Sequence, residues 1–443
     1  MWDYFDDKCV LITGGSGFLG TAIVYRLVTH TAATSPIYVL CRGGRKALYS
    51  RWRKLLPSQF ADRLCQSNRL IVVDGDIKKP NVGLSDAQID IVRQDVEIVI
   101  HAASSINLKT DLTTLTPTII QATETVAKFA LTCHVLTRFV YVSSAYANAH
   151  LGPRSEGIDV LVDERIYNPC QHDTALTEWK DVQKIGTSWV YEAEDYPWAY
   201  AYAKHLTERL LLQWFGDANA AQSLLIIRPS IIGPAQKVPY PGYCFPNSTP
   251  LTTATAAVLL STDLEMKTTT RFPNPDAEVH MDEVPVDVVA DRLLSHLAIG
   301  TAGCVHAVSG ERARMKYLEW WRSIMQLRQI PWEPKRIWLY ENWKTPNQHP
   351  ISQLWVAFGS SFCFSEDRTR AISEALVRNA DCADLQLFTT SNIARQLLER
   401  TEHLRTIMDQ LASKNPKDAK TIQTYYRGFG SDRRASVGMT ARL

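Results

Sequence analysis

Short apolar runs rich in β-branched residues alternate with longer stretches of helical periodicity over most of the chain. The seven runs that qualify as strands lie at 9–13, 37–41, 70–73, 97–101, 138–143, 223–228 and 304–308. Strands that alternate with helices in this way predict an α/β fold, with a parallel, doubly wound sheet and helices on both of its faces. The first run, Val-Leu-Ile-Thr, is almost wholly apolar, as expected for a central strand that is covered on both sides.

The pattern changes after Ser309. Four prolines and several tryptophans between 331 and 350 predict loops or irregular packing there. On either side of this region, apolar residues recur at helical spacing. The predicted helices are 315–327, 367–378 and 391–411.

This change of pattern predicts two domains. Residues 1–310 form the α/β domain, with insertions around 151–198 and 235–285 that we expect to bind substrate. Residues 311–443 form a smaller, mostly helical domain. Its Gly/Ser/Arg-rich end, from about Arg427, is expected to be disordered.

The composition is that of a soluble globular protein, with 45% apolar and 21% charged residues. The 48 basic and 46 acidic side chains leave a net charge of +2, so the overall charge does not favour nucleic acid as a partner. No run reaches the roughly 18 apolar residues that a membrane-spanning helix needs. The nearest, 354–364, is interrupted by Gly359 and two serines. We interpret it as core, with an interfacial patch for peripheral membrane contact as the alternative.

Nine cysteines are scattered along the chain without a C-x-x-C pair, and the eleven histidines show no zinc-type spacing. We therefore expect reduced thiols and no metal. The N-terminus enters the first strand without a charged segment followed by an apolar one, so no secretory signal is expected. Together these features predict a cytoplasmic protein.

A glycine-rich turn follows the first predicted strand and opens a helix. Its residues are Thr13, Gly14, Gly15, Ser16, Gly17, Phe18, Leu19 and Gly20. The first glycine permits the tight turn, a later one lets backbone approach a pyrophosphate, and the last lets helix and strand pack closely. The helix N-terminus adds free N–H groups and the positive end of its dipole. Directly after a β-branched strand, this spacing predicts a dinucleotide site on a Rossmann-type sheet.

The residues after the next three predicted strands favour NADPH as the dinucleotide. An acidic residue after the second strand would bind the ribose 2′-hydroxyl of NAD, but Arg42 stands here with Arg45 close by. Guanidinium groups suit the 2′-phosphate of NADP, with a solvated basic loop as the alternative. The cofactor-binding candidates after the third and fourth strands are Asp76, Ile77, Ala102 and Ala103. An Asp-Gly turn explains Asp76 equally well, and we interpret His101 as a hydrogen-bonded core residue.

Tyr200 and Lys204 are the candidate catalytic pair. They lie four residues apart near the start of a predicted helix and therefore project from one face. An ammonium group near a phenol lowers the pKa of the phenol, which would make Tyr200 a general acid for a carbonyl oxygen that receives hydride. We also expect Lys204 to reach the nicotinamide ribose. Tyr202 is not spaced for this pairing.

Two serines end the predicted strand 138–143. Ser143 and Ser144 stand at its carboxyl end, which faces the ligand crevice in an open α/β sheet. A serine hydroxyl there can donate to a substrate oxygen as negative charge builds on that oxygen. We assign this oxyanion role to Ser144. The sequence leaves Ser143, or a serine that only caps the following turn, as alternatives.

Together with these elements, several further segments resemble the extended short-chain dehydrogenase/reductase superfamily and, within it, the fatty acyl-CoA reductase (male-sterility-type) family. The resemblance covers about residues 5–310. It is carried by the glycine-rich opening and by Tyr141-Val142-Ser143-Ser144-Ala145-Tyr146-Ala147-Asn148, Asp163-Glu164-Arg165-Ile166-Tyr167, Arg228-Pro229-Ser230-Ile231-Ile232-Gly233, Pro239-Tyr240-Pro241-Gly242-Tyr243 and Asp282-Glu283-Val284-Pro285-Val286-Asp287. Within these segments, we count Pro229 and Ile232 among the cofactor-binding candidates.

The resemblance implies NADPH-dependent reduction of an acyl thioester, with Tyr200 as the acid, Lys204 as its partner and Ser144 as the oxyanion donor. The thiol would leave from a hemithioacetal, and the aldehyde would be released or reduced again to a primary alcohol. The related thioester reductase domains of carrier-protein synthases leave open whether the acyl group arrives on CoA or on a carrier protein. A free-aldehyde reductase and a dehydrogenase of a hydroxyl or ketone substrate are alternatives. Retention of all three catalytic candidates disfavours a nucleotide-sensing regulator.

Overall fold

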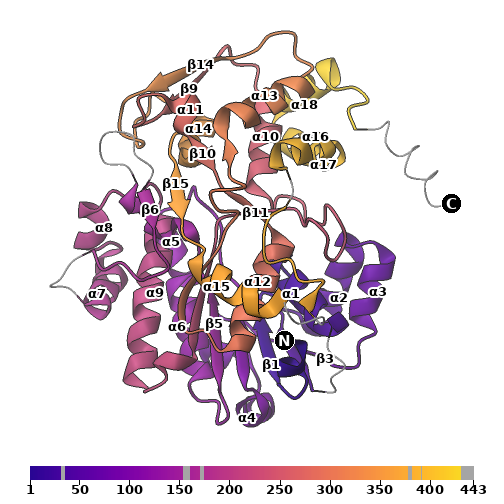
Figure 1. Cartoon of the computed structure of the whole chain (residues 1–443), viewed down its shortest axis with the longest axis vertical. Coiled ribbons are helices and arrows are strands. Elements are labelled where there is room, and N and C mark those ends of the chain that lie inside the picture. The colour runs from indigo at the N-terminus through magenta and orange to yellow at the C-terminus, as the bar shows by residue number, and fades with distance from the viewer. Residues whose placement is uncertain (31–34, 153–159, 170–173, 378–381, 391, 431–443) are drawn as a thin grey trace.

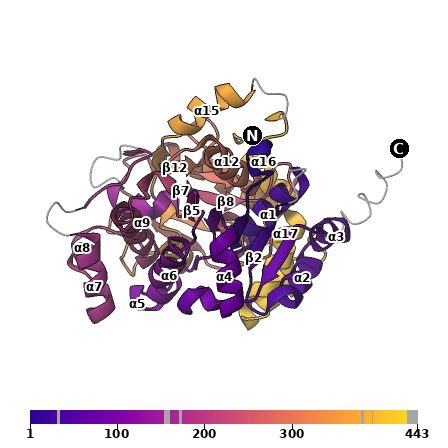
Figure 2. The ribbon, with the colours of Figure 1, turned by 90° about the horizontal axis from the view of Figure 1, so that it is seen from below.

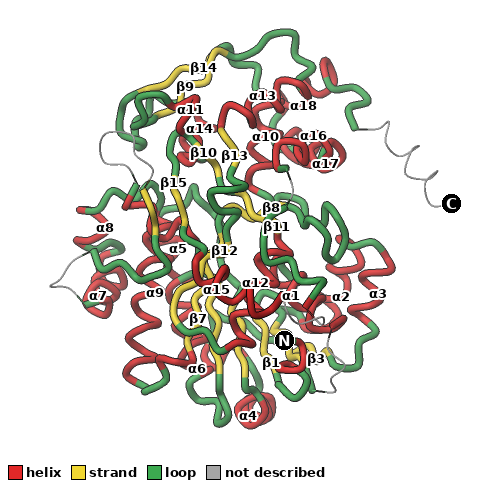
Figure 3. Tube along the Cα trace, viewed as in Figure 1, coloured by secondary structure: helices red, strands yellow, loops and turns green. Residues whose placement is uncertain are grey.

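A seven-stranded parallel sheet forms the centre of the computed structural model (Figures 1 and 3). The structure describes residues 1–30, 35–152, 160–169, 174–377, 382–390 and 392–430. The strands are β1 (Val10–Thr13), β2 (Ile37–Leu40), β3 (Leu70–Val73), β4 (Ile98–His101), β5 (Arg138–Val142), β7 (Leu224–Pro229) and β12 (Gly303–Ala307). All seven predicted strands are therefore confirmed, and so is the α/β fold.

The strand order explains where a ligand can bind. It runs β12-β7-β5-β4-β1-β2-β3, and every neighbouring pair is parallel. The chain therefore winds outward in one direction from β1 and in the other direction from β4. In sheets of this kind, a crevice opens at the carboxyl ends of the strands where the winding direction reverses.

Helices cover both faces of the sheet, and each face has its own apolar core (Figure 2). The first core includes α4 (Asp86–Asp95), α5 (Leu112–Leu115), α6 (Ile120–Ala130), α7 (Ala175–Ile185), α8 (Trp189–Ala193) and α9 (Ala199–Asp217). The second includes α1 (Phe18–His30), α2 (Gly44–Leu55), α3 (Ser58–Cys65) and α12 (Val286–Ile299). Another helix, α15 (Asp367–Val377), packs against α12 and β12.

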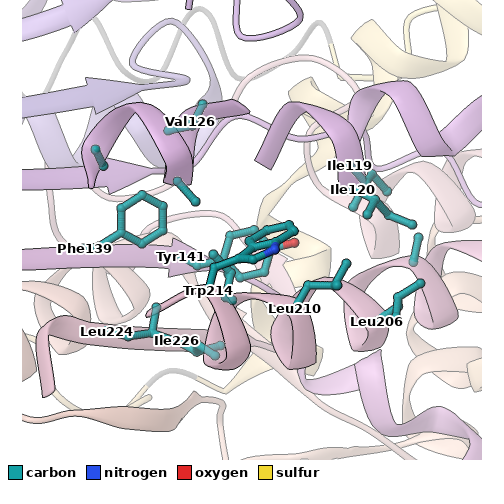
Figure 4. Close-up of a cluster of buried hydrophobic side chains, with 14 of the residues drawn as sticks. Ile119, Ile120, Val126, Phe139, Tyr141, Leu206, Leu210, Trp214, Leu224 and Ile226 are labelled. Atoms are coloured by element: carbon teal, nitrogen blue, oxygen red, sulfur yellow. The ribbon is translucent and has the colours of Figure 1, made fainter. Parts of the chain in front are cut away.

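The alternation of side chains along each strand produces these two cores. Phe139 and Tyr141 of β5 belong to the first core, whereas Val140 and Val142 belong to the second. Figure 4 shows the first core, in which β5 and β7 residues pack against α6 and α9. A strand covered in this way on both faces must be apolar at every position, as the sequence of β5 nearly is.

A smaller unit lies beyond the carboxyl ends of the strands (Figure 1). Its elements are α10 (Pro250–Leu260), β9 (Glu265–Thr269), α11 (Pro275–Glu278), β10 (His280–Met281), β13 (Met315–Lys316), α13 (Tyr317–Leu327), β14 (Lys335–Leu339), α14 (Pro350–Leu354), α16 (Ile393–Glu399), α17 (Thr401–Ala412) and α18 (Pro416–Tyr425). Trp320 is fully buried in its core, where the indole donates to Thr255 Oγ1 at 3.0 Å and packs on the Phe358 ring, with 4.5 Å between centroids. Residues from 251–281 thus share one core with residues from 315–358 and from 397–429.

Two short parallel pairs connect the sheet with the smaller unit. One joins β8 (Ile231–Gly233) to β11 (Glu283–Pro285), and the other joins β6 (Val160–Val162) to β15 (Phe362–Phe364). A buried ion pair lies beside the first, where Arg400 donates to both carboxylate oxygens of Glu283 at 3.1 and 2.9 Å.

The structure differs from the predictions in two places in the C-terminal part. The segment predicted as irregular contains β14, which pairs with β9, some 70 residues earlier, and the local proline content gives no sign of that distant partner. The predicted helix 391–411 divides at Arg400, whose side chain is held by Glu283. Near the start of the end predicted as disordered, Phe429 is buried in the smaller unit. Residues 431–443 lie outside the described residues.

The apolar segment 354–364 is core, as predicted. Val356, Ala357 and Phe358 are all buried, and Ala357 and Phe358 line a cleft at the carboxyl ends of the strands. Among the helices of the described residues, none is both long enough and apolar enough to span a bilayer.

Candidate active site

A cleft of about 440 Å³ lies where the carboxyl ends of the strands meet the smaller unit. Most of the predicted site residues line it, namely Gly14, Gly17, Phe18, Leu19, Gly20, Ala102, Ser144, Tyr200, Lys204, Pro229 and Ile232. The predicted residues that do not line it are Thr13, Gly15, Ser16, Arg42, Arg45, Asp76, Ile77 and Ala103. The fold thus brings the glycine-rich turn and the Tyr-Lys pair into one cleft, although about 180 residues separate them in the sequence.

The backbone of the glycine-rich turn leaves no room for a side chain at Gly14 or Gly20. Gly14 has a φ of +78°, and a Cβ atom there would lie 2.6 Å from the backbone nitrogen of Ala103. A Cβ atom at Gly20 would lie 2.1 Å from the carbonyl oxygen of Gly14, so α1 packs this closely on the turn only with glycine. Because α1 begins at Phe18, which lines the cleft, the positive end of its dipole lies there. The cradle fits the pyrophosphate of a dinucleotide.

The basic residues near the turn lie mostly outside the cleft. Arg42 and Arg45 are exposed, and the Arg45 guanidinium lies 5.0 Å from the centre of the Tyr49 ring. Arg51, which the sequence pattern did not mark, lines the cleft, and its Nε donates to the Ser16 carbonyl at 2.7 Å. Arg51 is therefore the α2 cation that contacts the glycine-rich turn.

The acidic residues after β3 hold turns. Asp74 accepts from the backbone nitrogen of Gly43 at 2.8 Å, which fixes the turn that follows Arg42. Asp76 accepts from the backbone nitrogen of Lys78 at 3.0 Å, in accord with the turn interpretation of this residue. Ile77 packs against the first core.

The prediction for His101 is confirmed. Its side chain is 1% exposed, with Nδ1 2.7 Å from Thr13 Oγ1 and Nε2 3.1 Å from Thr123 Oγ1. Burial, helped by the nearby Lys204 charge, lowers the pKa of His101 to about 3, so the ring is neutral at physiological pH. Thr13 thus supports the strand end beneath the turn.

Ser144, Tyr200 and Lys204 meet where β5 ends and α9 begins. Lys204 Nζ donates to the Val142 carbonyl at 2.9 Å and lies 5.9 Å from the centre of the Tyr200 ring. Ser144 is hydrogen-bonded to Tyr200, and its Oγ also accepts from the backbone nitrogen of Tyr146 at 3.2 Å. Ser144 therefore caps the turn after β5 and contacts Tyr200 with the same hydroxyl.

Ser143 differs from its neighbour. Its Oγ is buried and has no hydrogen-bond partner among the residues that the structure describes. Its backbone nitrogen donates to the Ile227 carbonyl at 2.7 Å and so continues the pairing of β5 with β7. Of the two serines, Ser144 is the one in contact with Tyr200.

At this site, burial shifts the pKa values of Tyr200 and Lys204 more than the neighbouring groups do. It raises the pKa of Tyr200 to about 12, and the Ser144 hydrogen bond opposes the rise. It lowers the pKa of Lys204 to about 7, and the Glu208 carboxylate opposes the fall. The expected lowering of the Tyr200 pKa by Lys204 is not found in the polypeptide alone, because desolvation disfavours both the phenolate and the ammonium. Tyr200 therefore holds its proton at neutral pH.

Helix α9 is held to the sheet by an ion pair that the sequence pattern did not reveal. Arg228, at the end of β7, donates to both oxygens of Glu208 at 2.9 and 2.6 Å, and neither side chain is exposed. Glu208 lies one turn after Lys204, so this pair fixes the catalytic helix relative to the strand ends. Tyr202 lies outside the cleft, since its hydroxyl is 2.5 Å from Ser188 Oγ and donates to Glu178 at 3.1 Å.

Two of the family-like segments support the wall of the cleft. The Asp287 carboxylate accepts from the backbone nitrogens of residues 236, 237 and 238 at 3.0, 2.8 and 3.0 Å, and so holds the loop that leads to Tyr243. The Tyr243 hydroxyl donates to the Phe18 carbonyl at 2.9 Å, at the start of α1. Asp282 in turn accepts from the Ser230 hydroxyl, which lines the cleft, at 2.5 Å.

The residues that line the cleft fall into two chemically distinct groups, which we call its two limbs, and Tyr200 lines the same cleft as both. The polar limb is the glycine-rich turn with Arg51. We call the other the apolar limb, and its residues are Ile106, Leu108, Tyr146, Trp198, Leu251, Trp355, Ala357 and Phe358. None of these was predicted as a site residue. The one local signal in the sequence is Trp198, which stands two residues before Tyr200.

Fold and cleft together define a nucleotide-binding α/β protein of the short-chain dehydrogenase/reductase type, and residues 12–293 match the NAD-binding domain profile of the male sterility protein family. The chain belongs to this family. It is similar to fatty acyl-CoA reductase 1 of Mus musculus, with 26% identity over 302 residues, which cover 66% of this chain and 55% of the mouse protein. The chain thus spans about half of that relative. The Homo sapiens protein aligns over 450 residues at 24% identity, covering 95% of this chain and 81% of its own length.

Solved structures with the same fold include reductase domains. The reductase domain of a nonribosomal peptide synthetase from Mycobacterium tuberculosis has a TM-score of 0.61 and 16% identity, covering 91% of this chain and 92% of its own. The terminal R domain of the myxalamid biosynthetic pathway has a TM-score of 0.58 and 16% identity, covering 88% and 89%. The Bordetella bronchiseptica enzyme WbmF, in complex with NADH, has a TM-score of 0.52 and 14% identity, covering 95% and 98%. At these identities, the likeness concerns the fold.

Proposed function

We propose that this protein reduces acyl thioesters with NADPH and releases an aldehyde or a primary alcohol. The observation that carries the proposal is that Ser144, Tyr200 and Lys204 line one cleft together with a dinucleotide cradle and an apolar limb. A reductase of acyl thioesters needs these three parts in one site. Membership of the male sterility protein family and the similarity to fatty acyl-CoA reductases support the same class.

The cofactor would lie along the polar limb. The glycine-rich turn and the start of α1 would bind its pyrophosphate, and Arg42 and Arg45 would bind the 2′-phosphate that distinguishes NADPH from NADH. Ala102, Pro229 and Ile232 would line its path toward Tyr200. When bound, this cofactor supplies the hydride.

Tyr200 and Ser144 would act on the thioester oxygen. Because its pKa is raised to about 12, Tyr200 is protonated at neutral pH and can donate to the oxygen on which charge develops. Ser144 would add a second hydrogen bond to that oxygen. Lys204 is held against the Val142 carbonyl and would favour the charged form of Tyr200 after proton donation.

The acyl chain would occupy the apolar limb. Its residues present aromatic and aliphatic side chains to the cleft that Tyr200 lines. We propose further that the helical part after residue 310, together with the insertion 235–285, forms the acyl-binding portion of the molecule. This limb is lined by Trp355, Ala357 and Phe358 from the part after residue 310, and by Leu251 from the insertion.

The test is NADPH consumption by the purified protein with a series of acyl-CoA thioesters from acetyl to stearoyl, with products identified by mass spectrometry. An aldehyde or alcohol product supports the proposal, and the ratio of NADPH to product separates one reduction from two. A parallel series of carrier-protein-bound acyl groups tells which thioester is used. Turnover of free aldehydes or ketones alone, without any thioester, would contradict the proposal.

A further inference from the structure

Trp198 connects the catalytic helix with the smaller unit. It is the N-cap residue of α9, two positions before Tyr200, and its carbonyl accepts from the backbone nitrogen of Ala201 at 3.1 Å. Its indole Nε1 donates to the Leu354 carbonyl at 3.1 Å, at the end of α14. One residue thus holds the first turn of α9 through its backbone and the smaller unit through its side chain.

The acceptor of this hydrogen bond, Leu354, directly precedes a segment that lines the apolar limb. Trp355 follows Leu354 directly, and its ring stacks on Phe358 with 6.0 Å between centroids and 24° between planes. Phe358 in turn packs on the fully buried Trp320. Any chain long enough to fill the apolar limb would contact this segment, because Trp355, Ala357 and Phe358 all line it.

Trp198 is also linked to Tyr200 through Tyr146 and Ser144. The Trp198 ring meets the Tyr146 ring edge to face, with 6.3 Å between centroids and 84° between planes. The backbone nitrogen of Tyr146 donates to Ser144, and Ser144 is hydrogen-bonded to Tyr200. Trp198 therefore caps the helix that carries Tyr200 and also contacts Tyr146, whose backbone nitrogen donates to the Ser144 hydroxyl.

We infer that Trp198 is a positioning residue that couples the filling of the apolar limb by an acyl chain to the placement of the Tyr200 hydroxyl. The inference rests on the proposed function. A long chain would hold residues 354–358 in place, and the indole would transmit this to the first turn of α9, whereas a short chain would not reach that segment. Because small misplacements of a reacting group cost large factors in rate, kcat should rise with chain length.

The kinetic test uses Trp198→Phe, which keeps an aromatic ring in the wall but removes the indole donor. We expect kcat for palmitoyl-CoA to fall roughly tenfold relative to kcat for butyryl-CoA, so that the advantage of the long chain is lost. Trp189→Phe is the matched control, because that indole stands on α8 and is 64% exposed. A residue that only lined the limb would change the KM for long chains and leave kcat unchanged, and that result would overturn the inference.

Hydrogen exchange gives a second measurement that does not depend on turnover. Without cofactor, palmitoyl-CoA should slow amide exchange in residues 199–204 of the wild type but not of Trp198→Phe. Equal protection in both proteins would overturn the coupling. If the wild type reduces thioesters but shows no protection, the inference alone is wrong. If it neither binds nor reduces any thioester, the proposed function falls as well.

Discussion

The two limbs of the cleft are built in different ways. The polar limb comes mainly from one continuous stretch, in which Gly14, Gly17 and Gly20 form a turn whose backbone conformation demands glycine. The apolar limb takes side chains from separate parts of the chain, from Ile106 to Phe358, and no backbone constraint specifies them. The first depends on local conformation, and the second depends on how two units pack. Substitutions in the polar limb and at Tyr200 should therefore cause large losses of activity or cofactor binding. Substitutions in the apolar limb should cause smaller losses that depend on the length of the acyl chain.

The largest effect on kcat is expected when the Tyr200 hydroxyl is removed. Tyr200→Phe should lower kcat by about 10² to 10⁴, because the general acid is lost, while NADPH binding is kept. Stopped-flow measurement of NADPH oxidation and a fluorescence titration of the cofactor would check the two parts. Tyr202→Phe is the control in the same helix, since that hydroxyl bonds Ser188 and Glu178 outside the cleft. Equal losses in both variants would show that α9 is merely perturbed.

The second effect concerns the cationic border of the polar limb. Arg42→Ala should raise the Kd for NADPH roughly 10- to 100-fold and leave the Kd for NADH unchanged, because a charge-assisted contact to the 2′-phosphate contributes about 1.5–3 kcal/mol. Titration of both cofactors would measure this ratio. Lys54→Ala, on the exposed surface of α2, the helix that follows Arg42, should leave it unchanged. An unchanged ratio in the Arg42 variant would remove the argument for NADPH.

The third effect is on stability and tests the burial of Lys204. Its pKa is about 7 in the folded protein and about 10.4 in the unfolded chain, so the unfolded state binds more protons between these values. The free energy of unfolding should therefore gain up to about 1.4 kcal/mol per pH unit from this group as pH rises from about 7 to 10.

Comparison with Lys204→Met isolates this contribution from other titrating groups. Below about pH 7, where lysine is protonated in both states, the variant should have its full stability advantage over the wild type. That advantage should shrink as pH rises toward 10. Urea unfolding at several pH values measures it, and a constant difference would contradict the lowered pKa.

The smallest effect is expected in the apolar limb. Ala357→Phe adds a ring to the buried wall beside Trp355, which should shorten the space for an acyl chain. We expect kcat/KM for the longest acyl-CoA esters to fall about five- to tenfold, with little change for short ones, in line with the modest energies by which apolar pockets discriminate chain length. A uniform loss for all chain lengths would indicate that the change distorts the catalytic residues instead.

The features that could be predicted from the sequence are those whose physical causes are local. Alternating apolar strands and helices gave all seven strands of the sheet, and the spacing of glycines marked the turn that Gly14 and Gly20 enforce. The interval from Tyr200 to Lys204 placed both residues on one helix face, and both line the cleft. Each of these features depends on residues a few positions apart, where backbone geometry leaves few choices.

The remaining features depend on tertiary packing and could not be predicted from local patterns. It assembled the apolar limb, paired Arg228 with Glu208 and placed Trp198 against the Leu354 carbonyl, across 156 residues of sequence. It also decided the protonation of the site, because the burial that raises the pKa of Tyr200 and lowers that of Lys204 comes from packing around them. Desolvation is set by every element that excludes water from a group, so no spacing along the chain specifies it.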